Sequence, residues 1–101
     1  MTAGINSAMS DPIRLIGALL NRMAGQADVE DSAEWYLRSY LIDYKRALLR
    51  KASSQQIEFA TDALLRFCAR SLDANAPLYR DCLEIAAAGA SLAAQLKALG
   101  N

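Results

Sequence analysis

Apolar residues recur at the spacing of an α-helix in four successive segments, and residues typical of helix ends separate these segments. An amphipathic helix repeats its apolar side chains every third or fourth residue, whereas a half-buried strand alternates them every second residue. The pattern predicts an all-α fold with helices near residues 12–25, 30–52, 54–72 and 77–99. Because short connections favour antiparallel neighbours, we expect a four-helix, largely antiparallel, bundle-like domain.

The first predicted helix begins at Asp11 and Pro12. Asp11 offers a capping oxygen, and Pro12 lacks an N–H group that the first helical turn does not need. One side of this segment carries Ile13, Ile16, Leu19, Leu20 and Met23. Residues 1–10 are rich in Gly, Asn and Ser without a helical period, so they are predicted to form a flexible N-terminal tail. A chain of 101 residues then leaves a single helical domain over 11–101.

The second predicted helix carries apolar residues on two faces. One stripe has the width of a core face and consists of Ala33, Leu37, Tyr40, Leu41, Tyr44 and Leu48. Trp35, Ile42 and Leu49 recur every seven residues on the other side, where Arg38 and Arg46 flank them. Exposing these three apolar residues forgoes about 2 kcal/mol of burial for each, so the helix is either central in the fold or covered by another chain. We predict that Trp35, Arg38, Ile42, Arg46 and Leu49 bind a partner, with the aromatic ring as anchor and the arginines as a polar rim.

The third predicted helix has a single buried face. Ser53 or Ser54 provides its cap, and Gln56 lies in its first turn. The buried face consists of Ile57, Ala60, Thr61, Leu64, Phe67, Cys68 and Leu72. The opposite face carries a charged series at i,i+4 spacing, which we expect to form a ladder of ion pairs in solvent: Glu58, Asp62, Arg66 and Arg70.

The fourth predicted helix begins with Asn75 as cap and Pro77 in the first turn. Its apolar residues alternate spacings of four and three, as in a coiled coil: Leu78, Cys82, Ile85, Gly89, Leu92, Leu96 and Leu99. Gly89 costs about 1 kcal/mol of helix propensity against Ala, and we expect the close approach of another backbone to compensate. This heptad seam and the second stripe of segment 30–52 predict a homodimer, with an intramolecular core as the alternative for the seam.

The chain contains no histidine. This absence removes the commonest general base and the commonest zinc ligand. No glycine-rich phosphate loop, paired CxxC motif or calcium-binding loop occurs in the sequence. We therefore expect no enzyme activity, no catalytic or metal-binding residues, and no cofactor.

Eleven Lys and Arg residues balance eleven Asp and Glu residues, so the chain has no net field that attracts nucleic acid or anionic lipid. Acidic residues gather at the start of segment 30–52 and basic residues at its end, which matches the helix macrodipole. The acidic group is Asp28, Glu30, Asp31 and Glu34, and the basic group is Lys45, Arg46, Arg50 and Lys51. Because the dipole explains the basic group and no aromatic and basic surface follows from the pattern, nucleic acid is not the expected partner.

Cys68 and Cys82 are the two thiols of the chain, and both fall on predicted core faces. We interpret them as small buried hydrophobic side chains, with a regulatory disulfide as the alternative. No apolar run approaches the length of a membrane span, and the first ten residues lack the features of a secretory signal. A cytoplasmic location is therefore expected.

These observations favour a non-enzymatic protein-interaction module that works as an adaptor, a chaperone-like cover or an inhibitor of a regulatory protein. The alternative is a small DNA-binding regulator, because Tyr44–Leu72 can be drawn as a helix-turn-helix around Ser53 and Ser54. Its recognition helix would carry no Lys or Arg before Arg66. A remoter possibility is a small anion held between helices, with candidate ligands Arg38, Lys45 and Arg80.

Overall fold

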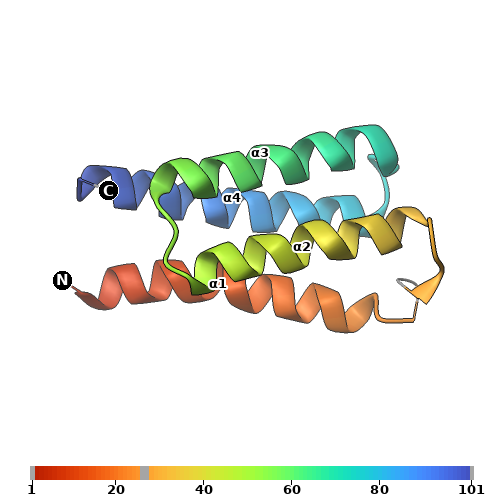
Figure 1. Ribbon diagram of the computed structural model, residues 1–101, viewed down its shortest axis with the longest axis horizontal. Coiled ribbons are helices and arrows are strands. Elements are labelled where there is room, and N and C mark those ends of the chain that lie inside the picture. Colours follow the sequence, from red (N-terminus) through yellow and green to blue (C-terminus); the bar gives the residue numbers. More distant parts are fainter. Residues whose placement is uncertain (1, 26–27, 101) are drawn as a thin grey trace.

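The computed structural model describes residues 2–25 and 28–100, and this part of the chain forms four helices (Figure 1). They are α1 (Thr2–Arg22), α2 (Ala33–Leu49), α3 (Ser54–Ser71) and α4 (Pro77–Ala98). Neighbouring helices run antiparallel, in a body of 42 × 22 × 22 Å. The prediction of an all-α, four-helix, largely antiparallel domain is confirmed.

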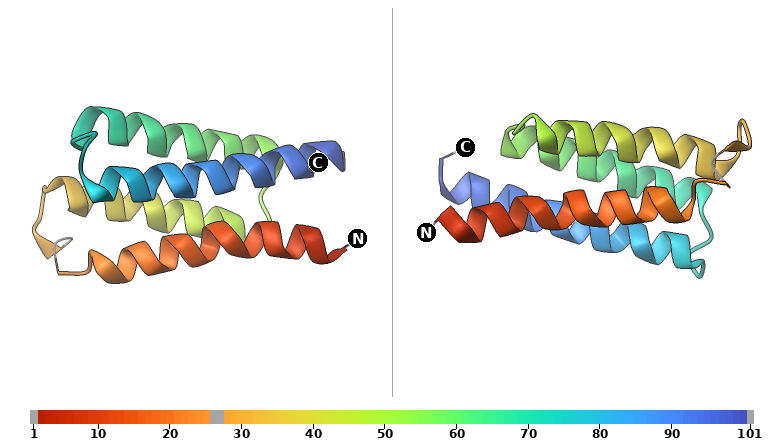
Figure 2. Two further views of the ribbon diagram at one scale, coloured as in Figure 1. Left: turned by 180° about the vertical axis from the view of Figure 1, so that it is seen from behind. Right: turned by 90° about the horizontal axis from the view of Figure 1, so that it is seen from below.

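Each helix packs against two others, so the four helices stand at the corners of a square bundle. α1 and α3 both contact α2 and α4, whereas the backbones of the diagonal pairs α1–α3 and α2–α4 are not in contact within the described residues. The views in Figure 2 show that the start of α1 and the end of α4 lie at the same end of the bundle. This arrangement leaves each helix an inner face, two flanks and one outer face.

The core is built from the inward stripes of all four helices. Its most deeply buried side chains are those of Ile16, Leu19, Met23, Leu37, Leu41, Tyr44, Leu48, Ile57, Leu64, Cys68, Cys82, Ile85 and Leu92. Each of these residues belongs to an apolar stripe of the sequence, whereas Pro12 and Ala93 are equally buried and belong to none of the predicted stripes. The heptad seam of α4 is buried from Cys82 to Leu92, while Leu99 at its end is exposed. Its buried part lies in the intramolecular core and is not available for self-association.

Helix α1 begins ten residues earlier than predicted, at Thr2. Residues 2–10, which were expected to form a flexible tail, thus belong to α1, and Met1 lies outside the described residues. Extending an existing helix adds one backbone hydrogen bond per residue without a new nucleus, so a segment of weak helical pattern can continue a packed helix. Pro12 removes one such bond from the helix interior. The burial of its side chain against the core offsets part of that loss.

The start of α3 confirms the predicted cap. The Ser53 hydroxyl oxygen accepts a hydrogen bond from the Gln56 N–H at 3.3 Å, and the Gln56 side-chain oxygen accepts one from the Ser53 N–H at 3.0 Å. This reciprocal capping box satisfies two N–H groups that a helix start otherwise leaves unpaired. The connection from α2 to α3 is therefore short and well defined.

The starts of α2 and α4 differ from the predictions in their caps. Helix α2 begins after Ser32, whose hydroxyl oxygen accepts a hydrogen bond from the Trp35 N–H at 3.1 Å. Most of the predicted first-turn acids thus precede the helix, and Glu34 is the acidic residue of its first turn. Helix α4 begins at Pro77 as expected, but its N-cap residue is Ala76, which provides no side-chain hydrogen bond to the helix start. The Asn75 N–H instead donates to the Asp73 carboxylate in the preceding turn.

Tyr44 of α2 crosses the bundle and reaches the diagonal helix α4. The Thr61 hydroxyl donates to the Ile57 carbonyl at 2.8 Å, so its oxygen accepts the hydrogen bond that the Tyr44 hydroxyl donates. A Cβ atom added at Gly89 would lie 1.6 Å from the Tyr44 hydroxyl oxygen. Gly89 therefore makes room for a buried side chain, whereas the sequence predicted the approach of another backbone. Burial raises the pKa of Tyr44 above its usual value.

Candidate partner-binding surfaces

The five residues predicted to bind a partner lie on α2 away from its core face, and we call them the outer patch: Trp35, Arg38, Ile42, Arg46 and Leu49. Ile42 is 38% exposed and Leu49 is 61% exposed, while Trp35 is half-buried. The alternative that these apolar residues are central core is therefore not realised for Ile42 and Leu49. Four helices complete the core without using this face of α2.

The aromatic anchor of the outer patch is positioned by the start of α2. The backbone N–H of Trp35 bonds to the Ser32 cap, and its ring meets the Tyr36 ring edge-on, with centroids 4.9 Å apart at 86°. The Tyr36 hydroxyl donates to the Asp31 carboxylate at 2.8 Å. This hydrogen bond, with the nearby negative charge, raises the pKa of Tyr36. Local contacts thus orient the indole at one end of the patch.

The two arginines of the outer patch form long, exposed ion pairs. Arg38 Nη1 lies 3.7 Å from Asp28 Oδ1, and Arg46 Nη1 lies 3.7 Å from Asp43 Oδ1. Exposed pairs of this kind contribute about 0–1 kcal/mol, so a partner's carboxylate can replace either acid at little loss. Lys45 lies between Ile42 and Leu49 in the sequence, and its side chain reaches α1. Its Nζ atom lies 3.9 Å from the point where a Cβ atom would be if Gly17 carried a side chain. The patch therefore borders the groove between α1 and α2.

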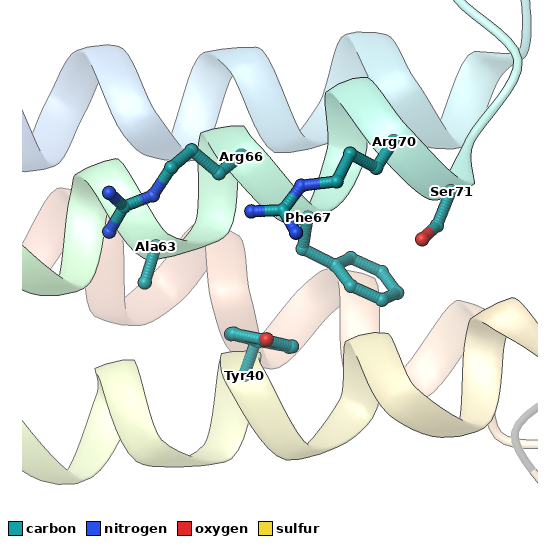
Figure 3. A pocket seen from close by; sticks show the side chains of 6 residues that line it. All are labelled: Tyr40, Ala63, Arg66, Phe67, Arg70 and Ser71. Atoms are coloured by element: carbon teal, nitrogen blue, oxygen red, sulfur yellow. The ribbon is translucent and has the colours of Figure 1, made fainter.

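A second surface feature lies between α2 and α3, where a hollow of about 220 Å³ opens to solvent (Figure 3). We call it the arginine hollow, and its lining residues are Tyr40, Ala63, Arg66, Phe67, Arg70 and Ser71. The rings of Tyr40 and Phe67 stack with centroids 4.9 Å apart at 32°. Tyr40 was predicted to belong to the core stripe of α2, but it is 40% exposed. Its position on the flank that faces α3 places it at the edge of the core.

The predicted charged ladder on α3 does not form. Glu58 Oε1 pairs instead with Lys97 Nζ of α4 at 2.8 Å. Among the described residues, Arg66 and Arg70 take part in no ion pair and in no side-chain hydrogen bond. In Figure 3 both side chains extend in the same direction along α3, and the Arg70 guanidinium lies over the hollow close to Phe67. The ion pair with Lys97 shows that Glu58 lies on the flank of α3 that faces α4.

Sequence reasoning missed this aromatic and basic surface because its members come from two helices. Tyr40 belongs to α2, whereas Phe67 and both arginines belong to α3. The available signal was the spacing of Arg66 and Arg70, one turn apart and on either side of Phe67 in sequence. Phe59, which no predicted stripe includes, is also 71% exposed on α3.

Cys68 of α3 and Cys82 of α4 are fully buried free thiols, as predicted. The hydrogen bond between the two thiols and their burial raise the pKa of Cys82 above its usual value. Both factors favour the neutral thiol at Cys82 in the folded chain. A regulatory disulfide between the two residues stays a prediction.

The residues of the alternative hypotheses are not brought together. Arg38 and Lys45 belong to α2 and Arg80 to α4, and the backbones of these diagonal helices are not in contact. Helices α2 and α3 lie antiparallel, whereas the helices of a helix-turn-helix cross at about 90–120°. Ser54 is buried, and the side-chain oxygen of the exposed Gln56 accepts the capping-box hydrogen bond from the Ser53 N–H.

Within residues 2–25 and 28–100, no helix is long and apolar enough to cross a membrane. Comparisons with protein-family models, with curated proteins and with solved structures find no match to this chain.

Proposed function

We propose that this chain is a protein-interaction module, an adaptor or regulator that acts by covering a surface of another protein with the outer patch of α2. The observation that carries the proposal is the exposure of Ile42 and Leu49 in line with Trp35, on a helix whose opposite face completes the core. Fully burying such a side chain contributes about 1.5–3 kcal/mol, so covering the exposed 38% of Ile42 and 61% of Leu49 contributes a part of that range at each. A folded chain that leaves them in water gains that contribution when a partner covers them.

The composition of the outer patch supports a protein as the occupant. Protein interfaces combine an aromatic or aliphatic centre with a polar rim in which arginine is enriched. The patch supplies Trp35 as anchor, Ile42 and Leu49 as apolar centre, and two arginines whose present ion pairs are weak. A second copy of the chain is one such protein, and a symmetric dimer through this patch is the simplest form of self-association.

The test compares two double variants that introduce the same charges at equally exposed leucine or isoleucine positions. Ile42→Asp with Leu49→Asp alters the outer patch, where the side chains are 38% and 61% exposed. Leu83→Asp with Leu99→Asp alters α4, where they are 43% and 64% exposed. Both variants should keep their helicity and cooperative melting, because none of the four residues is buried.

The tagged wild type and the α4 variant should capture the same protein from the native lysate, while the outer-patch variant should lose it. Light scattering of each purified protein shows whether the 11.0 kDa chain is a monomer or whether a second copy is the partner. Equal capture by all three proteins, or equal loss in both variants, would contradict a role for the outer patch.

A further inference from the structure

The two arginines of the arginine hollow form no ion pair among the described residues, whereas both arginines of the outer patch do. We propose that it binds a carboxylate side chain of an acidic peptide segment, with Arg66 and Arg70 holding the carboxylate and an adjacent apolar side chain resting on Tyr40 and Phe67. This inference rests on the proposed function, since it names the chemistry by which the protein partner is recognised.

The hydrogen-bonding groups that line the hollow suit an anion. Arg66 and Arg70 contribute guanidinium donors, Ser71 and Tyr40 contribute hydroxyl groups, and the lining contains no carboxylate. The two arginines are one helical turn apart on α3, so their guanidinium groups can reach the same ligand. Guanidinium groups bind carboxylates through paired hydrogen bonds that are stronger than those between neutral groups.

These arginines differ from the others near the candidate surfaces in having no acid to release. Arg38 and Arg46 must give up Asp28 and Asp43 before either can bind a partner's carboxylate. Arg66 and Arg70 give up no ion pair of the described residues. Anion binding in the hollow therefore adds a charge pair without breaking an existing one.

The apolar side of the hollow is held in place before any ligand binds. Tyr40 and Phe67 stack across the groove between α2 and α3, and Ala63 leaves space beside them (Figure 3). Rings fixed in this way present a contact surface without further loss of side-chain freedom. A ligand with an apolar group next to its carboxylate matches both halves of the hollow.

The surroundings favour a single carboxylate over an extended polyanion such as nucleic acid. Asp62 lies one turn before Arg66 on α3, and Asp43 lies about one turn after Tyr40 on α2; both are exposed. A run of phosphates along the groove would meet these two carboxylates, and the chain has no net positive charge to offset the repulsion. A hollow of about 220 Å³ accommodates side chains of a peptide.

The probe is the blocked dipeptide acetyl-phenylalanyl-glutamyl-amide, titrated into the isotope-labelled full chain while backbone amide signals are followed by NMR. The neutral probe replaces the glutamyl residue by glutaminyl. We expect saturable shifts at Tyr40, Ala63, Arg66, Phe67, Arg70 and Ser71 with the acidic probe at millimolar concentrations, and affinity about ten-fold lower for the neutral probe.

The variants separate this site from a general effect of charge. Arg66→Gln with Arg70→Gln should abolish the preference for the acidic probe. Arg50→Gln with Arg80→Gln changes the net charge equally, at exposed arginines outside the hollow that also form no ion pair among the described residues, and should keep it. Equal binding of the two probes, shifts elsewhere, or no saturable shift would overturn the inference. Phenyl phosphate binding at least about ten-fold tighter at the same residues would also overturn it, since the site would then be one for phosphoryl groups.

Partner capture distinguishes this inference from the proposed function. If the outer-patch variant loses the partner while Arg66→Gln with Arg70→Gln captures it as well as the wild type, the proposed function holds and the hollow has no role in recognition. If the hollow prefers the acidic probe but capture is indifferent to Ile42→Asp with Leu49→Asp, the outer patch fails and the hollow stands. Loss of capture in both variants, together with probe preference, supports both.

Discussion

The inner and outer faces of α2 carry similar apolar residues in opposite surroundings. On the inner face Leu37, Leu41, Tyr44 and Leu48 are at most 1% exposed. On the outer face Leu49 is 61% exposed, although it directly follows Leu48 in the chain. The inner face is covered because α1 and α3 flank it and Tyr44 reaches α4. A stripe of apolar residues thus indicates that burial of that helix face is favourable. Whether the chain itself buries the face depends on which helices pack against it.

The largest expected difference between the two faces comes from shortening one leucine on each. Leu41→Ala should lower the free energy of unfolding by about 2–5 kcal/mol, because it leaves a cavity in the core. Leu49→Ala removes the same atoms from a mostly exposed side chain, and the change should stay below about 1 kcal/mol. Urea denaturation of the two variants measures both values, and similar losses would mean that the faces are not energetically distinct.

Gly89→Ala tests how tightly the inner face is filled. The added Cβ would overlap the Tyr44 hydroxyl, so the buried ring must move, and overpacking of this kind costs about 1–3 kcal/mol. The higher helix propensity of Ala than of Gly offsets at most about 1 kcal/mol of this cost. The net effect on thermal unfolding should be destabilising. Tyr44→Phe in the same chain removes the overlapping oxygen, so the loss from Gly89→Ala should be smaller in that background than in the wild type.

Alkaline pH should weaken the buried core through two groups, Tyr44 of α2 and Cys82 of α4. Cys82 and Tyr44 have folded pKa values raised above the ordinary values of 9.0 and 10.0. Their contribution to stability is fully present below those ordinary values, and it is lost as the pH rises toward the folded values. The free energy of unfolding should therefore fall above about pH 9, by up to about 1.4 kcal/mol per pH unit for each group. Urea denaturation across this range should give a shallower decline for Tyr44→Phe, and an unchanged slope would rule out the phenol as a source.

The rim of the outer patch should give the smallest effect on folding. Arg46→Gln breaks an exposed ion pair with Asp43, so the free energy of unfolding should change by less than about 0.5 kcal/mol. The same substitution should weaken partner capture if the rim contacts the partner. A loss of stability comparable with that of Leu41→Ala would place Arg46 in the fold and not in an interface.

The local features of the sequence determined most of the helical plan. The 3.6-residue period of apolar residues identified four helices and most of the deeply buried side chains, because amphipathic helices bury the stripe that the period defines. The capping box of Ser53 and Gln56 and the position of Pro77 followed from chemistry within one helical turn. The sequence also separated the two stripes of α2, and Ile42 and Leu49 are exposed where the second stripe was drawn.

The tertiary structure alone decided which distant residues meet. The pairing of Glu58 with Lys97, the position of the Tyr44 hydroxyl over Gly89, and the meeting of Tyr40 with Phe67 depend on the rotation and register of packed helices. These quantities are set by interdigitation of many side chains at once, which no spacing within one helix encodes. The arginine hollow was missed for the same reason, since its rings and charges are neighbours across two helices and not along the chain. The extension of α1 through Pro12 was missed because Asp11 and Pro12 form a local signal for a helix start, and the burial of the Pro12 ring depends on the assembled bundle.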